Sequence, residues 1–334
     1  MKPAVLVTGA TGFVGAELVR ELCARGHDVD VLARRSSDRS VLAGSSVRWR
    51  DGDLDSPTAL DAAVRALVAR SGPTWVVHSA AVISYATRDR ELQRRVNVDG
   101  TRHVLEACRA HGVTRVLHVS SVVAVGHARD ASELLDEDAP YNNAALRCDY
   151  ADTKRAAEEL ALEAARELDV VVVNPGAIFG TSPRAPNTIK FLHKLAHGPH
   201  IPFTPPGSLS VVGVRDVALG CILALERGRR ARRYLLCESA WTSLESFQLA
   251  ARLLGVRAPR RSAPRWLWSA LERGARAVDL VAPPTLLTPT AVRMLGAHFR
   301  FDSARARREL GWEPRPFEEV LQTTIAALRA RGEI

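Results

Sequence analysis

Short apolar runs recur along the first half of the chain and alternate with segments of helical periodicity. Apolar runs without polar alternation are typical of strands buried on both faces of a parallel sheet. We expect strands over residues 4–8, 28–33, 46–51, 74–80, 115–121 and 169–175. We expect helices over residues 14–25, 57–70, 89–111 and 150–168. This alternation predicts an α/β fold with a doubly wound parallel sheet and right-handed crossovers.

The pattern changes after Pro175, where proline and glycine become frequent. Proline-rich stretches occupy residues 183–188, 197–207 and 257–265. They predict loops and short elements at the carboxyl edge of the sheet. We therefore divide the chain into a dinucleotide-binding domain, residues 1–175, and residues 176–334. The second part is expected to be mainly a smaller substrate-binding lobe, with some elements that return to the sheet.

A glycine-rich turn separates the first predicted strand from the first predicted helix. It reads VTGATGFVG over residues 7–15, with glycines three positions apart. A helix N-terminus offers unpaired N–H groups and partial positive charge to a phosphate. Gly9 would allow the tight turn, Gly12 the close approach of a pyrophosphate, and Gly15 the packing of helix on strand. The turn predicts a Rossmann-type sheet and dinucleotide binding by Gly9, Thr11, Gly12, Phe13, Val14 and Gly15.

The end of the second predicted strand bears on the choice of nicotinamide cofactor. An acid at this position usually holds the ribose hydroxyls of NAD. Here Arg34 and Arg35 follow the strand instead. Because guanidinium groups bind phosphate through paired hydrogen bonds, they favour the 2′-phosphate of NADP(H). The alternative is NAD(H) bound through backbone contacts, beside a solvated pair of arginines.

A tyrosine and a lysine stand four residues apart at the start of the helix expected over residues 150–168. Tyr150 and Lys154 would therefore share one helix face. A phenol has an ordinary pKa of about 10, and a neighbouring ammonium group favours its ionised form. Tyr150 would act as general acid or base on a carbonyl or alcohol, and Lys154 would also bind the nicotinamide ribose. The alternative is a solvated helix face that has this spacing by chance.

Nine motifs occur in an order that resembles the extended branch of the short-chain dehydrogenase/reductase superfamily, also called the NAD-dependent epimerase/dehydratase superfamily. They read TGATGFVG, GDLDSP, HSAAV, RRVNVDGT, VLHVSS, YADTK, VNPGAIFG, VRDVALG and ARRELGWEP. The resemblance covers nearly the whole chain. It is strongest to the dihydroflavonol-reductase and hydroxysteroid-dehydrogenase-like group.

This resemblance implies site roles for further residues. Those that would border the nucleotide follow the third and fourth strands: Asp53, Leu54, Ala80 and Ala81. Asn97 would hold the central helix and its bound water, and Pro175 would lie against the nicotinamide. Ser121 would hydrogen-bond the reacting oxygen, with Ser120 as the second choice. With the tyrosine and the lysine, Ser121 and Asn97 complete the expected catalytic set.

The resemblance leaves three classes of function open and argues against a fourth. The fourth is the dehydratases, which carry an Asp-Glu pair after the catalytic hydroxyl residue, where this chain has Val122 and Val123. We expect an NADP(H)-dependent ketoreductase or alcohol dehydrogenase acting on a bulky, largely apolar molecule. The first alternative is an NAD-dependent nucleotide-sugar epimerase. Its anion could be held by Arg184, His193, Lys194, His197, His200 and Arg215. The second alternative is a non-catalytic dinucleotide-binding sensor or scaffold.

Charge and cysteine content add expectations about partners and compartment. The net charge is +9, nearly all from arginine, but no nucleic-acid motif accompanies it. Five scattered cysteines without a C-x-x-C pair argue for the cytoplasm and against a metal site. No apolar stretch could span a bilayer. The segment around Trp266 and Trp268 is apolar with a basic rim. It could be an ordinary helix packed on the protein, close an apolar substrate pocket, or contact a membrane surface peripherally. The resemblance also implies a homodimer formed through the helices at 89–111 and 150–168.

Overall fold

A seven-stranded sheet lies at the centre of the computed structural model, which describes residues 2–181, 187–199, 202–279 and 288–334. Its order is β10-β6-β5-β4-β1-β2-β3, and every neighbouring pair is parallel. The strands are β1 (Ala4–Thr8), β2 (Asp28–Ala33), β3 (Val47–Asp51), β4 (Thr74–His78), β5 (Arg115–Val119), β6 (Val170–Pro175) and β10 (Arg233–Leu236). From β1 the chain adds β2 and β3 on one side of the sheet, and then β4, β5, β6 and β10 on the other side. Folds of this class bind their ligands at this switch point between β1 and β4.

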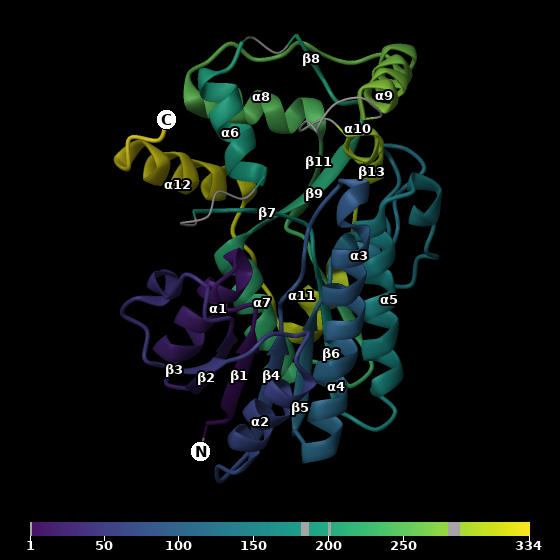
Figure 1. Cartoon of the computed structure of the whole chain (residues 1–334). Coiled ribbons are helices and arrows are strands. Elements are labelled where there is room, and N and C mark those ends of the chain that lie inside the picture. The colour runs from purple at the N-terminus through teal and green to yellow at the C-terminus, as the bar shows by residue number, and fades with distance from the viewer. Residues whose placement is uncertain (1, 182–186, 200–201, 280–287) are drawn as a thin grey trace.

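Two layers of helices cover the sheet (Figure 1). One core cluster joins one sheet face to α1 (Phe13–Ala24), α7 (Val214–Arg227) and α11 (Ala304–Leu310). The other joins the opposite face to α2 (Pro57–Val68), α4 (Gly100–His111) and α5 (Asp149–Ala164). The doubly wound α/β fold that the alternation predicts is therefore confirmed, and the six expected strands form within two residues of their expected ends.

The helix expected over residues 89–111 is built from several pieces. A 3-10 turn, η2 (Thr87–Asp89), leads into α3 (Arg90–Gln93), a π-helical segment η3 (Arg94–Asp99) and then α4. Insertions of this kind are frequent at functional sites, because they rotate the following side chains relative to a regular helix. Here the π-helical segment carries Asn97.

Residues 176–334 contain more regular structure than the proline-rich stretches predict. They form β7 (Ala177–Phe179), α6 (Asn187–His197), β8 (Phe203–Thr204), β9 (Ser208–Gly213), β11 (Ser239–Thr242), α8 (Ser243–Leu254), β12 (Arg261–Ser262), α9 (Arg265–Asp279), α10 (Pro289–Gly296), β13 (His298–Phe299) and α12 (Phe317–Ala330). Side-chain caps stabilise the first turns of two of these helices. Thr242 and Glu245 form a capping box on α8, and Thr288 caps α10. The expectation of loops and short elements was therefore wrong where α6, α8, α9 and α10 form. At the end of the chain the sequence also predicts a helix that stops at Gly311, a proline-rich turn and a final helix, and these form as α11 and α12.

Several of these later elements return to the sheet, in addition to the strand β10. Asp216 of α7 is buried and accepts from the Arg315 guanidinium at 3.0 Å. The Trp312 indole Nε1 donates to the Asp216 carbonyl oxygen at 2.8 Å. These contacts tie the C-terminal motif ARRELGWEP to the helix that covers the sheet. Neither β10 nor α7 was predicted, because short edge strands and uncapped helices leave weak local patterns.

Candidate active site

The glycine turn connects β1 to α1 and has no room for side chains at two positions. Gly9 has a φ of +72°, and a Cβ there would lie 2.5 Å from the Ala80 backbone nitrogen. A Cβ on Gly15 would lie 2.2 Å from the Gly9 carbonyl oxygen. Gly12 is the N-cap of α1, no side chain caps this end, and its first turn holds no acidic residue. First-turn N–H groups have no intrahelical partner, so a diphosphate fits this cradle sterically and electrostatically.

The residues expected at the adenine end lie around the carboxyl edge of the sheet. Leu54 is buried, and a Cβ on Gly100 would lie 2.9 Å from the Leu54 Cβ. Its side chain therefore belongs to the core beneath α4. Asp53 is partly exposed, and its Oδ1 accepts the Leu54 amide at 2.7 Å. Ala80 packs on the glycine turn, and Ala81 is exposed. Asp53 and Ala81 can meet a nucleotide with their side chains, whereas Leu54 cannot.

Two exposed arginines follow β2, and they differ in their partners. The Arg35 Nε lies 3.3 Å from the Asp51 Oδ2, and Arg39 also pairs with Asp51. These two guanidinium groups lower the pKa of the Asp51 carboxyl, with Arg39 contributing most. Among the described residues, Arg34 has no ion pair. Sequence reasoning missed Asp51, although it is the last residue of a predicted strand and pairs with Ala33 across the sheet.

Tyr150 lies in the first turn of α5 and is buried. The Ser121 side chain acts on this hydroxyl and lowers its pKa, so the two hydroxyl groups lie close together. Ser121 follows β5 and is partly exposed, and its Oγ accepts the Val123 amide at 3.4 Å. Ser120 points into the fold, where its Oγ has no hydrogen-bond partner among the described residues. The structure therefore brings Ser121, and not Ser120, to the tyrosine.

Lys154 is buried one turn further along α5, and its Nζ donates to the Val119 carbonyl oxygen at 2.8 Å. Burial lowers the pKa of Lys154 to about 8, and the carboxylate of Glu158 opposes this shift. Burial also raises the pKa of Tyr150 to about 12, against the opposing effect of Ser121. We expected a lowered tyrosine pKa from the neighbouring ammonium group. The direction is the opposite because burial of the phenol raises its pKa, and the Lys154 ammonium is not among the groups that shift it.

Asn97 fastens the catalytic helix to the loop that follows β4. Its Oδ1 accepts the Val82 amide at 2.8 Å, and its Nδ2 donates to the Val82 carbonyl at 3.0 Å. The same Nδ2 donates to the Thr153 Oγ1 at 3.2 Å. Thr153 directly precedes Lys154, so Asn97 is connected to the helix that carries the lysine. Pro175 ends β6 and is buried. The roles of all these residues stay predictions.

A buried polar group behind the site was missed by sequence reasoning. Glu158 is fully buried on α5, and its Oε2 accepts the Asn174 Nδ2 at 2.5 Å. The Arg233 Nη1 of β10 lies 3.0 Å from the Glu158 Oε1. Asn174 also donates to the Ser121 carbonyl oxygen at 3.0 Å. Glu158 thus links the strand that carries Ser121 to the helix that carries Lys154. Its spacing four residues after the lysine was the signal available in the sequence.

Apolar side chains from distant parts of the chain surround the tyrosine. The ring of Tyr85 packs edge-on at 6.3 Å between centroids, and Thr288 at the start of α10 donates to the Tyr85 carbonyl at 2.9 Å. Met294 of α10 belongs to the same buried cluster as Tyr150. The cluster's other members include Val122, Val123, Cys148, Leu235 and Phe299. Apolar side chains from four parts of the chain therefore pack around the tyrosine ring.

The candidate anion-binding residues do not converge on one place. His193 lies 3.4 Å from a Glu333 carboxylate oxygen, and His197 contacts the Glu333 carbonyl at 3.2 Å. The Arg215 Nε instead lies 3.4 Å from a Glu17 carboxylate oxygen on α1. Two other candidates, Arg184 and His200, lie outside the described residues. These residues stay candidates for the anion of the epimerase alternative, although the two histidines lie at Glu333 and Arg215 lies at Glu17.

A family model described as the NAD dependent epimerase/dehydratase family matches residues 5–237, more than half of the chain. The chain belongs to this family. It is an extended short-chain dehydrogenase/reductase, as its motifs indicate, and an NAD(P)-dependent enzyme of that class. NAD(P) binding therefore explains the glycine cradle at the start of α1.

Relatives of this short-chain dehydrogenase/reductase align with nearly its full length. It is 35% identical to the sterol demethylase protein B of Methylococcus capsulatus, over 98% of this chain and 99% of the relative. It is 30% identical to a putative dihydroflavonol 4-reductase of Synechocystis sp., over 100% and 97% of the two chains. The crystal structure of gox2253 has a TM-score of 0.85 and 31% identity, and the match covers 100% of both chains. The Rossmann fold is thus shared along the whole chain.

Proposed function

We propose that this enzyme reduces a ketone, or oxidises a secondary alcohol, on a bulky and largely apolar molecule, with NADP(H) as its preferred cofactor. The observation that carries the proposal is the buried Tyr150, whose hydroxyl lies close to Ser121 and whose side chain packs in a cluster of apolar residues. A ketone oxygen placed beside these two hydroxyl groups would face apolar walls.

Three side chains of the protein would transfer the proton and position the reacting groups. A bound nicotinamide dinucleotide supplies or accepts the hydride. Tyr150 donates its proton to the carbonyl oxygen during reduction and accepts the alcohol proton in the reverse direction. Ser121 orients the substrate oxygen through its hydroxyl. Lys154, held by the Val119 carbonyl, keeps a positive charge next to the tyrosine and favours the phenolate that forms.

Three observations favour an apolar ketone over a nucleotide sugar. The positions after Ser121 hold buried Val122 and Val123 rather than acids. Three of the four described anion candidates interact elsewhere, two with Glu333 and one with Glu17. Relatives of full length are named for a sterol and for a dihydroflavonol, which are both bulky ring systems. An NAD-dependent epimerase is the second candidate, supported by the family model and by a solved nucleoside-diphosphate-sugar epimerase from Pseudomonas aeruginosa that is 26% identical with a TM-score of 0.80.

The NADP(H) preference rests on the arginines after β2. Arg34 is exposed and has no ion pair among the described residues, so its guanidinium is available to a 2′-phosphate. Arg35 forms an ion pair with Asp51, so its guanidinium is less available to a 2′-phosphate than that of Arg34. β2 ends at Ala33 without an acid of its own, and Asp51, which lies beside Ala33 at the end of β3, is paired with Arg35 and Arg39.

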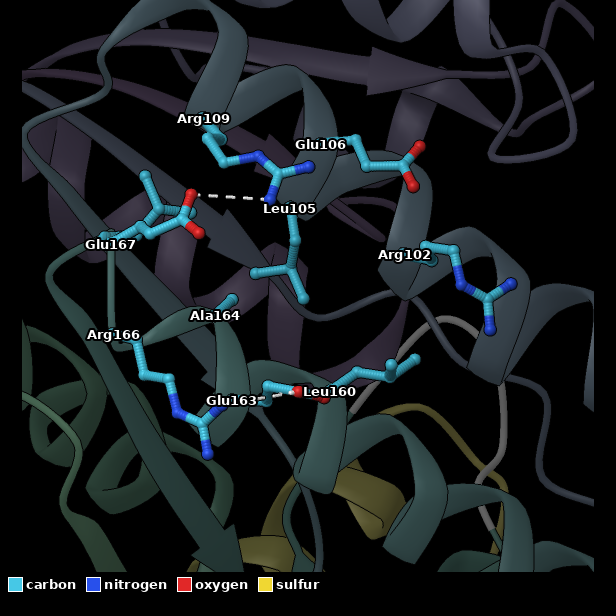
Figure 2. Close-up of a pocket in the computed structure, with 10 residues that line it drawn as sticks. Arg102, Leu105, Glu106, Arg109, Leu160, Glu163, Ala164, Arg166 and Glu167 are labelled. Carbon is cyan, nitrogen blue, oxygen red and sulfur yellow. Dashed lines mark hydrogen bonds and ion pairs between the residues drawn. The ribbon is translucent and has the colours of Figure 1, made fainter.

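We also propose a homodimer formed through α4 and α5. A hollow lies between these helices and is lined by Arg102, Leu105, Glu106, Arg109, Leu160, Glu163, Ala164, Arg166, Glu167 and Leu168 (Figure 2). Its leucines are flanked by charges of both signs, which can pair with a second copy across a two-fold axis. Leu160 is about 15 Å along α5 from the tyrosine, at 1.5 Å per residue. Sedimentation of Leu160→Glu should show a monomer if this face is the interface.

Tyr150→Phe tests the catalytic proposal. The substitution removes only the hydroxyl, so we expect the loss of ketone reduction with an NADPH affinity within about twofold of wild type. Wild-type turnover in this variant would remove Tyr150 from the chemistry. Tightly retained NAD and inversion of a nucleotide sugar would instead identify the epimerase. Cofactor binding without turnover on any cyclic ketone or steroid would indicate a sensor.

A further inference from the structure

The helix α9 is fixed to the protein by one face. The Trp268 indole Nε1 donates to the Val292 carbonyl of α10 at 3.0 Å. Glu272, one turn further on, lies 3.1 Å from the Arg293 Nη1 of α10. Both helices lie at the end of the molecule opposite the N-terminus (Figure 1). These contacts orient the remaining face of α9 away from the protein.

The helix α9 and the strand β8 expose large apolar side chains, and the two on α9 lie five positions apart, on different sides of its outer half. Trp266 is 71% exposed, the largest value among the exposed large apolar residues that the structure describes. Leu271 on the same helix is 39% exposed, and Phe203 on β8 is 42% exposed. Phe203 pairs with Arg261 of β12, the strand that directly precedes α9. We call this set, Phe203, Trp266 and Leu271, the apolar patch.

Arginines are frequent in the part of the sequence that carries most of the apolar patch. Residues 255–279 contain six arginines but only two acidic residues, Glu272 and Asp279. Arg276 pairs with Glu272. The described part of the chain offers no ion-pair partner to the other five: Arg257, Arg260, Arg261, Arg265 and Arg273. Most arginines elsewhere in the described structure lie beside a carboxylate, so unpaired positive charge is concentrated in this part of the sequence.

We propose that the apolar patch and its arginines dock on an anionic phospholipid bilayer. Tryptophan favours the membrane interface, where its ring lies at headgroup level, and guanidinium groups bind lipid phosphates. An amphipathic helix with this arrangement lies in the plane of the interface. Within the described residues no helix is long and apolar enough to cross a bilayer, so the contact is peripheral. Nucleic acid would satisfy the arginines, but a protruding leucine and tryptophan on one helix suit lipid better.

The surface deepens the proposed function, because an enzyme for bulky apolar molecules would meet its substrate where such molecules partition. The patch belongs to the lobe that supplies the apolar wall: α9 packs on α10, and α10 carries Met294 beside the catalytic tyrosine. Docking would therefore place the substrate side of the enzyme, rather than the nucleotide side, next to the bilayer.

Co-sedimentation with vesicles tests the proposal. The full-length protein should bind vesicles of phosphatidylcholine and phosphatidylglycerol more tightly than vesicles of phosphatidylcholine alone, and less tightly at high salt. Each basic residue at an anionic surface accounts for about fivefold in binding, so Arg260→Glu with Arg261→Glu should weaken it by about 30-fold or more. Trp266→Ser should weaken it by about tenfold.

Matched controls separate this surface from the overall positive charge. Arg129→Glu with Arg331→Glu removes the same charge elsewhere, and Leu134→Ser removes another exposed apolar side chain. Both should retain wild-type binding. Equal losses in the controls and the patch variants would overturn the proposal. So would wild-type binding by folded patch variants, or binding of a single-stranded oligonucleotide without vesicle binding.

Reduction of a water-soluble cyclic ketone without lipid is measured in parallel. Turnover without vesicle binding overturns only the docking surface, and vesicle binding without turnover overturns only the proposed function. Thermal unfolding of each variant confirms that it is folded.

Discussion

Replacing Glu158 with glutamine should move the pH range over which the enzyme works. The substitution keeps the size of the side chain and removes its negative charge next to buried Lys154. Charges one helical turn apart lie about 6 Å from each other. At an effective dielectric constant of about 20, they interact by about 3 kcal/mol, equivalent to about two pKa units. The wild-type carboxylate raises the lysine pKa, which burial holds at about 8. Removing it therefore lowers that pKa further.

The consequence for activity follows from the protonated fraction of Lys154. Activity needs the ammonium form, so it falls as pH rises through the lysine pKa. At pH 7.5 about three-quarters of wild-type lysine is charged, against about 3% in the variant, from the two pKa values. We expect kcat/KM for NADPH to fall about 25-fold at pH 7.5 and to recover to within about twofold at pH 6. Buried His78 and His118 also face the lysine, but their lowered pKa values keep them neutral here.

Two further variants make this test decisive. Glu159→Gln is the matched control, since Glu159 is exposed and pairs with Arg155 at 2.7 Å. It should leave the pH profile unchanged. Glu158→Gln leaves the largely buried charge of Arg233 without its partner, which could destabilise the protein. The double variant Glu158→Gln with Arg233→Met removes that unpaired charge and so separates loss of stability from the effect on Lys154. Its profile should also be shifted to lower pH. A loss of activity that is equal at pH 6 and pH 7.5 would refute the electrostatic role of Glu158.

Other predictions concern the cofactor and the site serine. Arg34→Ala should raise KM for NADPH by about tenfold or more and leave KM for NADH nearly unchanged, whereas equal losses would show that Arg34 does not read the 2′-phosphate. Gly15→Ala would force a Cβ to 2.2 Å from the Gly9 oxygen, so we expect a Tm several degrees lower and weak cofactor binding. Gly274→Ala, with open space around it, should not lower Tm. Ser121→Ala should reduce kcat by about 100-fold, measured at saturating ketone, whereas Ser120→Ala should retain activity within about threefold.

The amino-acid sequence by itself determined the alternation of strands and helices, the glycine turn and the spacing of Tyr150 and Lys154. These features depend on local periodicity and on the steric limits of a few adjacent residues. Their positions in the fold follow from a parallel sheet, which brings every strand's carboxyl end to one edge. The motifs therefore indicated both the fold and the family, and the comparisons confirmed them.

Only the tertiary structure decided which side chains surround those motifs. It placed Ser121 on the tyrosine and Ser120 in the core, because the chain direction after β5 is set by packing. It raised the pKa of Tyr150 through burial, which depends on residues as distant as Met294. It also joined Glu158 to β10, a strand without a clear sequence pattern. Long-range packing fixes burial and charge partners, and local sequence does not encode them.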